Sequence, residues 1–278
     1  MPWFLRIAVA VLCPLIAAAA NPAYPWCVDY DTSQTLEKRI NPPEGFTRVA
    51  ADSGSFAAWL RGLPMHGRFA LVQYYNGVPK WNQGVAHAVI DVDVGDRDLQ
   101  QCADAVIRLR SEFLHCSKRY DDIRFNFTSG DTAAWRDWIK GMRPSVSGHK
   151  VTWSKRAAVD SSYRSFKKYL EIVFSYAGSA SLSKELTKVS DVSKMQTGDV
   201  FIQGGFPGHA VIVIDMVENS RGERLFLLAQ SYMPAQDIHV LRNPNESGLS
   251  PWYNLKFDGE LKTPEWTFRK SDLKRFAK

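Results

Sequence analysis

The amino-acid sequence predicts an α+β fold in which helical segments come first and an antiparallel sheet follows. Between Ser55 and Val189, several segments have apolar side chains at three- and four-residue steps, the period of an amphipathic helix. From Asp199 onward, β-branched and aromatic residues form short runs between turn residues, as in consecutive strands. The chain of 278 residues shows no repeat and no Pro-, Ser- or Gly-rich linker, so we expect residues 21–278 to form one domain.

The first twenty residues are typical of a secretory signal peptide. Arg6 supplies a positive charge, Ile7–Ile16 is a short apolar run, and Ala17–Ala20 are the small residues of a cleavage site. We therefore expect residues 1–20 to be removed and the mature chain to act in the periplasm or outside the cell. The apolar run is shorter than a typical span, and no lipoprotein-type cysteine follows it, so no stable membrane insertion is predicted. An uncleaved anchor is the alternative.

Helices are predicted where helical apolar spacing lies between start and stop residues. The first follows Ser55 and stops at Gly62. A longer helix, capped by Asp96 or Asp98, carries one apolar face made of Leu99, Cys102, Val106, Leu109 and Phe113. Further helices are predicted over residues 132–139, 163–177 and 181–189.

Strands are predicted in β-branched runs bounded by turn residues, over residues 69–75, 85–94, 123–127, 200–203, 208–215, 224–230 and 238–241. A two-residue turn within Asn219–Gly222 would pair residues 208–215 with 224–230 and set His209 opposite Tyr232. Gln230 would then lie on the same face as His209, across a diagonal of roughly 7 to 8 Å. A register slip of one residue would separate them. Asp215 would share this face, but about 20 Å away.

Three cysteines remain after the signal peptide, so at least one thiol of the monomer is unpaired. Cys102 and Cys116 lie on one predicted helix, about 21 Å apart, and cannot bond to each other. Cys27 can pair with either of them or with neither.

A cysteine nucleophile needs a base, a group that orients the base, and a helix start that favours thiolate. Cys102 lies near a helix start, although its apolar stripe is also consistent with a buried structural cysteine. His209 begins a strand after the glycine-rich residues 204–208, and His87 in a similar string is a rival base. The histidines and cysteines show no metal-ligand spacing, and no metal or cofactor is predicted. The net charge of +6 is spread along the chain, so no nucleic-acid partner is predicted.

The residues Gly208–Ile214 and Gln230–Tyr232 resemble the papain pattern of His-Ala-Val in one strand and Asn-Ser-Trp at the end of the next. With Gly198–Ile202 ahead of them, they also resemble NlpC/P60 and CHAP cell-wall peptidases. The resemblance implies a papain-like or NlpC-like architecture with Cys102 as nucleophile, His209 as base and Gln230 as orienting amide. No glutamine occupies the usual oxyanion position, and Asn82 and Gln83 are the candidate substitutes.

Over nearly its whole mature length, the chain also resembles a bacterial family called domain of unknown function 4846. The resemblance is carried by residues 55–64, 99–106, 207–211 and 229–236. It implies no particular activity.

These observations predict an exported cysteine hydrolase that cleaves an amide or peptide bond, with cell-envelope peptides as the natural substrate. If Cys102 is its nucleophile, the disulfide must join Cys27 to Cys116. The alternative is a non-catalytic periplasmic or surface binding protein of the same fold. The Glu265–Phe268 segment could line a glycan groove, or pack aromatic rings into the core.

Overall fold

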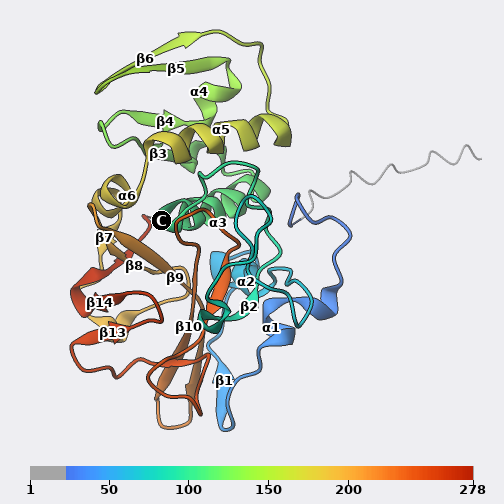
Figure 1. The fold of residues 1–278 in the computed structure, drawn as a ribbon, viewed down its shortest axis with the longest axis vertical. Coiled ribbons are helices and arrows are strands. Elements are labelled where there is room, and N and C mark those ends of the chain that lie inside the picture. Colours follow the sequence, from blue (N-terminus) through green and yellow to red (C-terminus); the bar gives the residue numbers. More distant parts are fainter. Residues whose placement is uncertain (1–22, 278) are drawn as a thin grey trace, which may run out of the picture.

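The computed structural model describes residues 23–277, and the predicted signal peptide lies outside them. A nine-stranded sheet forms its centre, and neighbouring strands follow the order β2-β11-β10-β9-β8-β15-β7. β1 joins the sheet through β9, β12 joins it through β10, and every pairing is antiparallel (Figure 1). The strands are β1 (Phe46–Arg48), β2 (Ala86–Val89), β7 (Thr187–Lys188), β8 (Val200–Gln203), β9 (His209–Asn219), β10 (Arg224–Gln230), β11 (His239–Leu241), β12 (Tyr253–Asn254) and β15 (Leu273–Arg275).

Three separate hairpins, six α-helices and five short 3-10 helices complete the described chain; the 3-10 helices are Thr32–Gln34, Gln83–Val85, Tyr120–Asp122, Val192–Lys194 and Lys270–Asp272. The hairpins are β3 (Arg124–Asn126) with β4 (Thr132–Ala134), β5 (Met142–Ser147) with β6 (Lys150–Lys155), and β13 (Glu260–Lys262) with β14 (Thr267–Arg269). The helices are α1 (Leu36–Arg39), α2 (Phe56–Arg61), α3 (Cys102–Cys116), α4 (Trp135–Ile139), α5 (Tyr163–Tyr176) and α6 (Ser179–Glu185). The predicted α+β class is confirmed, although short strands also lie between the helices.

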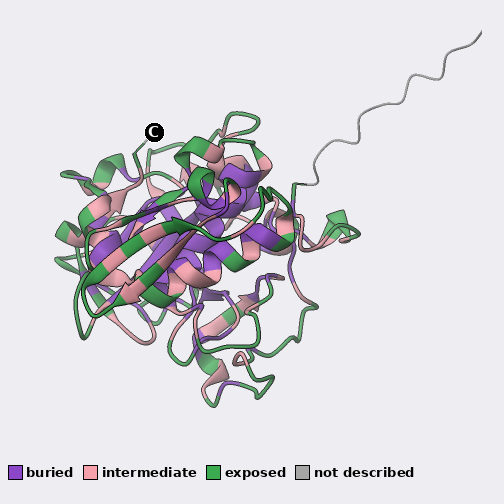
Figure 2. Cartoon of the chain, turned by 90° about the horizontal axis from the view of Figure 1, so that it is seen from above, coloured by how far each residue is buried: buried purple, intermediate pink, exposed green. Residues whose placement is uncertain are grey.

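The central sheet has an apolar core on each face. On one face, alternate β9 residues such as Ala210 and Ile212 share a core with Val106 and Leu109 of α3. On the other face, Val211 belongs to a second core with residues of the last strands. Buried residues therefore gather at the centre of the molecule, and exposed ones lie in the peripheral loops (Figure 2). Burial on both faces makes β9 nearly continuously apolar, which is why its sequence predicts a strand so clearly.

Helix α3 begins later than the sequence predicts. Its N-cap is Gln101, whose backbone N–H donates to the Asp104 carboxylate at 3.1 Å. Asp98, one of the two expected caps, instead accepts the Ala235 backbone N–H at 2.7 Å from another loop. Cys102 is consequently the first residue of the helix and begins its first turn.

Several other boundaries differ from the prediction. Residues 69–75 form a loop with two isolated bridges, Gln73 to Pro79 and Tyr74 to Gln236, because this segment packs against residues 78–80 and 235–237 instead of joining the sheet. The strand expected over residues 85–94 is shortened to β2, and residues 132–139 divide into β4 and α4. The helices after Ser55 and Ser162 and the strands β8 and β10 lie where they were predicted.

The three described cysteines are free thiols, so the expected disulfide between Cys27 and Cys116 is not found. The Cys27 thiol donates to Asp91 Oδ2 at 3.4 Å, and the Cys116 thiol donates to the Ala23 carbonyl at 3.0 Å. Each sulfur thus has an oxygen acceptor of its own. Within residues 23–277, no helix has the length and apolar character to span a membrane.

Candidate functional site

The three residues singled out from the sequence lie at the ends of three elements. His209 is the first residue of β9, Gln230 the last of β10, and Cys102 the first of α3. His209 Nε2 lies 2.8 Å from Gln230 Oε1, within hydrogen-bond distance. The Cys102 thiol lies beside the backbone amide of Ala210, the residue after His209. These three residues therefore form a cluster at one end of the sheet, in which the imidazole contacts the amide and the thiol contacts the backbone beside His209.

The register between β9 and β10 explains the contact between His209 and Gln230. Ala229 pairs with Ile212, which is the register predicted from the turn. Nearer the turn, Leu227 pairs with Asp215, so Ile214 is an extra residue in β9 and forms a β-bulge. The loop of the turn is thus one residue longer than predicted. The bulge compensates for this extra residue, so the pairing near the site has the predicted register.

The bulge also corrects the expected position of Asp215. Asp215 pairs with Leu227, whose side chain belongs to the helix-side core, so Asp215 does not share a face with His209. Its fully buried carboxylate binds Arg61 of α2 at 2.6 Å and Arg48 of β1 at 2.8 Å. This ion-pair cluster attaches α2 and β1 to the sheet.

The side-chain amide nitrogen of Gln230 has two further partners. It donates to Glu265 Oε2 at 2.7 Å and lies 3.5 Å from His239 Nε2. Glu265 belongs to the loop between β13 and β14, and its other oxygen forms a 2.7 Å ion pair with Lys80. Both partners of this ion pair are shielded from solvent, with side-chain exposures of 14% for Glu265 and 3% for Lys80.

Aromatic rings cover the imidazole. The ring of Tyr232 lies 4.8 Å from that of His209, and the ring of Trp266 lies 5.3 Å away. The Trp266 indole N–H donates to Gln203 Oε1 at 3.0 Å, which holds the ring in place. His209 is 1% exposed and Cys102 8% exposed, so the cluster is closed to solvent.

Burial sets the protonation states of the cluster. It raises the pKa of the Cys102 thiol from 9.0 to about 11, and the nearby Asp104 adds to this increase. Burial lowers the pKa of His209 to about 4, with a smaller contribution from the charge of Lys80. Near neutral pH the closed site therefore holds a neutral thiol and a neutral imidazole.

Backbone amides adjoin the thiol. Those of Ala210, Ala103 and Cys102 itself act against the burial and lower the thiol pKa. Hydrogen-bond donors grouped at a nucleophile in this way can also stabilise a developing oxyanion.

The other candidates from the sequence are not near this cluster or are already engaged. His87 is exposed on β2, and β11 and β10 lie between β2 and β9 in the sheet. The Gln83 amide is used by the backbone of Val72 and Lys80, and the Asn82 oxygen accepts the Gly84 N–H. The Gln83 amide nitrogen is therefore not free to serve as the expected oxyanion donor.

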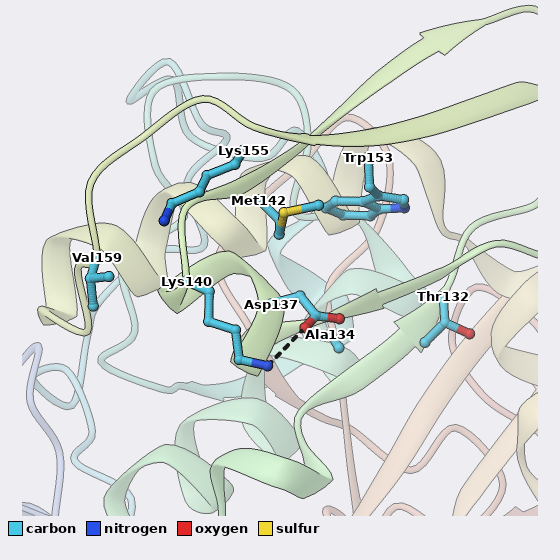
Figure 3. A pocket seen from close by; sticks show the side chains of 8 residues that line it. All are labelled: Thr132, Ala134, Asp137, Lys140, Met142, Trp153, Lys155 and Val159. Atoms are coloured by element: carbon cyan, nitrogen blue, oxygen red, sulfur yellow. Dashed lines mark hydrogen bonds and ion pairs between the residues drawn. The ribbon is translucent and has the colours of Figure 1, made fainter.

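No group of three or more histidine, cysteine or acidic residues within residues 23–277 could hold a metal ion. A surface cavity of about 550 Å³ lies between α4 and the β5–β6 hairpin, with Trp153 and Met142 in its wall (Figure 3). None of Cys102, His209 and Gln230 lines it.

Sequence reasoning missed Lys80, Glu265 and His239 as members of the cluster. His239 pairs directly with Gln230 across β10 and β11, so a prediction that these two strands are adjacent would have identified it. Lys80 and Glu265 lie in loops that meet only in the folded chain, and no local pattern relates them. The segment Glu265–Phe268 was interpreted through its aromatic residues, and both Trp266 and Phe268 indeed pack on His209.

Comparison with known proteins gives one match. The model of a family described as domain of unknown function (4846) matches residues 36–275, which is most of the chain. No curated protein and no solved structure matches.

Proposed function

The chain belongs to the domain of unknown function 4846 family, and from the geometry of its site we propose that it is an exported cysteine hydrolase that cleaves an amide or peptide bond. One observation carries the proposal. The imidazole of His209 is oriented by Gln230 at 2.8 Å, and the Cys102 thiol, which begins a 15-residue helix, lies beside the backbone amide of the next residue, Ala210. A base, its orienting amide and a thiol at a helix start are the parts that nucleophilic thiol catalysis requires.

The proposed reaction has two halves. In the first, His209 accepts the Cys102 proton, the sulfur attacks the carbonyl carbon, and the C–N bond breaks as His209 returns the proton to the leaving amine. In the second, His209 accepts a proton from water, the resulting hydroxide attacks the thioester, and the proton returns to the sulfur as the acid leaves. The amides of Ala210 and Cys102 are the proposed donors to the oxyanion.

The closed site must open for this reaction to occur. Burial is the largest cause of both pKa shifts, since it raises the pKa of Cys102 and lowers that of His209. Opening would therefore bring the two pKa values closer together and make proton transfer between them less costly. We propose that substrate entry displaces the covering ring of Tyr232 and thereby activates the thiol.

Envelope peptides are the proposed substrate class, because the N-terminal residues predict export to the compartment that contains them. The alternative is a binding protein that retains this fold, and the 8% exposure of Cys102 and 1% exposure of His209 favour it. In that case the thiol and the imidazole are buried structural groups.

The two functions can be separated by incubating the mature protein with peptidoglycan-derived peptides and following new amine termini by mass spectrometry. Hydrolysis that is lost in Cys102→Ser and kept in Cys116→Ser would support the hydrolase, because Cys116 lies at the opposite end of α3. Unfolding of Cys102→Ser, with no cleavage by the wild-type protein, would favour the binding protein. A thioester intermediate trapped on Cys102 at low pH would identify the nucleophile directly.

A further inference from the structure

The hydrogen bonds around Gln230 determine which way its amide points. His239 Nδ1 lies 2.9 Å from the Asp237 carbonyl oxygen, and a carbonyl only accepts. His239 is buried, and its pKa is lowered to about 4, so it is neutral and carries its single proton on Nδ1. Its Nε2 is then an acceptor. The Gln230 amide nitrogen therefore faces two acceptors, the Glu265 carboxylate at 2.7 Å and His239 Nε2 at 3.5 Å.

This orientation determines the tautomer of His209. With its nitrogen directed to Glu265 and His239, Gln230 can present only its oxygen to His209 Nε2, at 2.8 Å. His209 Nε2 must therefore carry the proton, because two acceptors cannot form a hydrogen bond. A neutral imidazole has one N–H, so its Nδ1 holds a free lone pair. Among residues 23–277, no hydrogen-bond donor engages that nitrogen.

Of the two acceptors, Glu265 is the one that an ion pair fixes in place. Its Oε1 forms a 2.7 Å ion pair with Lys80, whose side chain is 3% exposed. The loop that carries Lys80 is itself held by Gln83, which donates to the Lys80 and Val72 carbonyls at 2.8 and 2.9 Å. The charge of the ion pair and the fixed loop keep an anionic acceptor at the nitrogen end of Gln230.

We infer that Glu265, held by Lys80, is a positioning residue that fixes His209 in the tautomer with its proton on Nε2 and its lone pair on Nδ1. The catalytic meaning of this tautomer rests on the proposed function, since a base needs a free lone pair for the Cys102 proton. The assignment of donors and acceptors around Gln230 does not depend on any reaction.

The substitution Glu265→Gln tests the inference because an amide can donate as well as accept. The introduced amide can then present an N–H to Gln230, and Gln230 can turn over and offer its own N–H to His209 Nε2. His209 would then have to carry its proton on Nδ1. Nitrogen-15 NMR of histidine-labelled protein distinguishes these tautomers directly, with the His209 signals assigned by their loss in His209→Phe.

We expect wild-type His209 to show a protonated Nε2 and an unprotonated Nδ1. Glu265→Gln should shift His209 partly or wholly to the other tautomer, whereas Glu265→Asp, which keeps the carboxylate, should retain the wild-type signals. Glu260→Gln is the matched control, because Glu260 is exposed on β13 of the same hairpin. If Glu265→Gln is unstable through loss of the Lys80 ion pair, the double variant Lys80→Met/Glu265→Gln removes both buried charges at once.

Two outcomes would overturn the inference: a wild-type His209 with its proton on Nδ1, which requires no variant, or unchanged His209 signals in a folded variant that lacks the Glu265 carboxylate. If hydrolysis is found, Glu265→Gln should lower kcat by about 10- to 100-fold with little change in KM, because the wrong tautomer removes the base. If the tautomer shifts and no peptide is cleaved by the wild-type protein, the proposed function fails and the positioning role stands.

Discussion

Removal of the Tyr232 ring should make Cys102 reactive. This ring lies 4.8 Å from that of His209, and an ionised Cys102 would raise the pKa of Tyr232, so the tyrosine covers the imidazole within electrostatic range of the thiol. Tyr232→Ala would admit water to the cluster and relieve the burial that raises the thiol pKa. Tyr232→Phe keeps the ring and is the matched control.

The pKa shift sets the size of the effect. If the opened site cancelled the whole net shift, the Cys102 pKa would fall from about 11 to 9.0, which increases the thiolate fraction near neutral pH roughly 100-fold. A less basic thiolate is also a weaker nucleophile, which reduces the gain in alkylation rate to about 10-fold. Easier access for the reagent can only add to this increase.

The assay is the rate of iodoacetamide labelling at each cysteine, resolved by peptide mass spectrometry. Cys27 and Cys116 are internal references, because burial raises their pKa values to about 11 and about 12 for reasons unrelated to Tyr232. Equal Cys102 rates in Tyr232→Ala and Tyr232→Phe would refute this account of the closed site. The same conclusion would follow if all three cysteines became faster together, because that result indicates general unfolding.

Three further predictions concern stability and processing. Gly208→Ala should destabilise the protein by about 1 to 3 kcal/mol in urea unfolding, since its methyl group would overlap Ser179 and the Gln203 carbonyl, whereas Gly67→Ala, which has open space around it, should be nearly neutral. His115→Phe should stabilise the protein, because both ring nitrogens of His115 are buried without partners. The difference in the free energy of unfolding between His115→Phe and the wild-type protein should grow by about 3 kcal/mol as the pH falls from 6.5 to 4, because His115 binds a proton in the unfolded state but stays neutral in the folded state. A difference that does not change with pH would contradict this prediction. Mass spectrometry of the exported protein should show an N-terminus near Asn21, and an intact Met1 would disprove the predicted cleavage.

The sequence allowed the strands and the long helix around the site to be predicted because their local patterns agree with their final environment. β8 and β10 contain continuous apolar runs, residues 200–202 and 225–229, and α3 carries its apolar stripe along its full length. The neighbourhood of His209 and Gln230 was predicted from a turn one residue too short, and the β9 bulge compensates for that residue, so the predicted register holds at the site.

The features that could not be predicted depend on contacts between distant segments. The cap of α3 moved to Gln101 because Asp98 binds a loop more than a hundred residues later in the chain. The ion pair between Lys80 and Glu265 joins two loops, and neither loop has a periodic pattern. The β9 bulge lies next to Asp215, whose buried carboxylate binds Arg48 and Arg61. The β-branched pattern of the strand does not indicate these ion pairs.

The bulge at Ile214 divides β9 into two segments whose pairings with β10 are offset by one residue. The pairing beside the distal turn, residues 219–223, and the pairing beside His209 therefore have different registers within one continuous strand. A loop exchanged at that end of the sheet should leave the 2.8 Å contact between His209 and Gln230 in place, which makes the turn a suitable position for a tag or a fluorescent reporter.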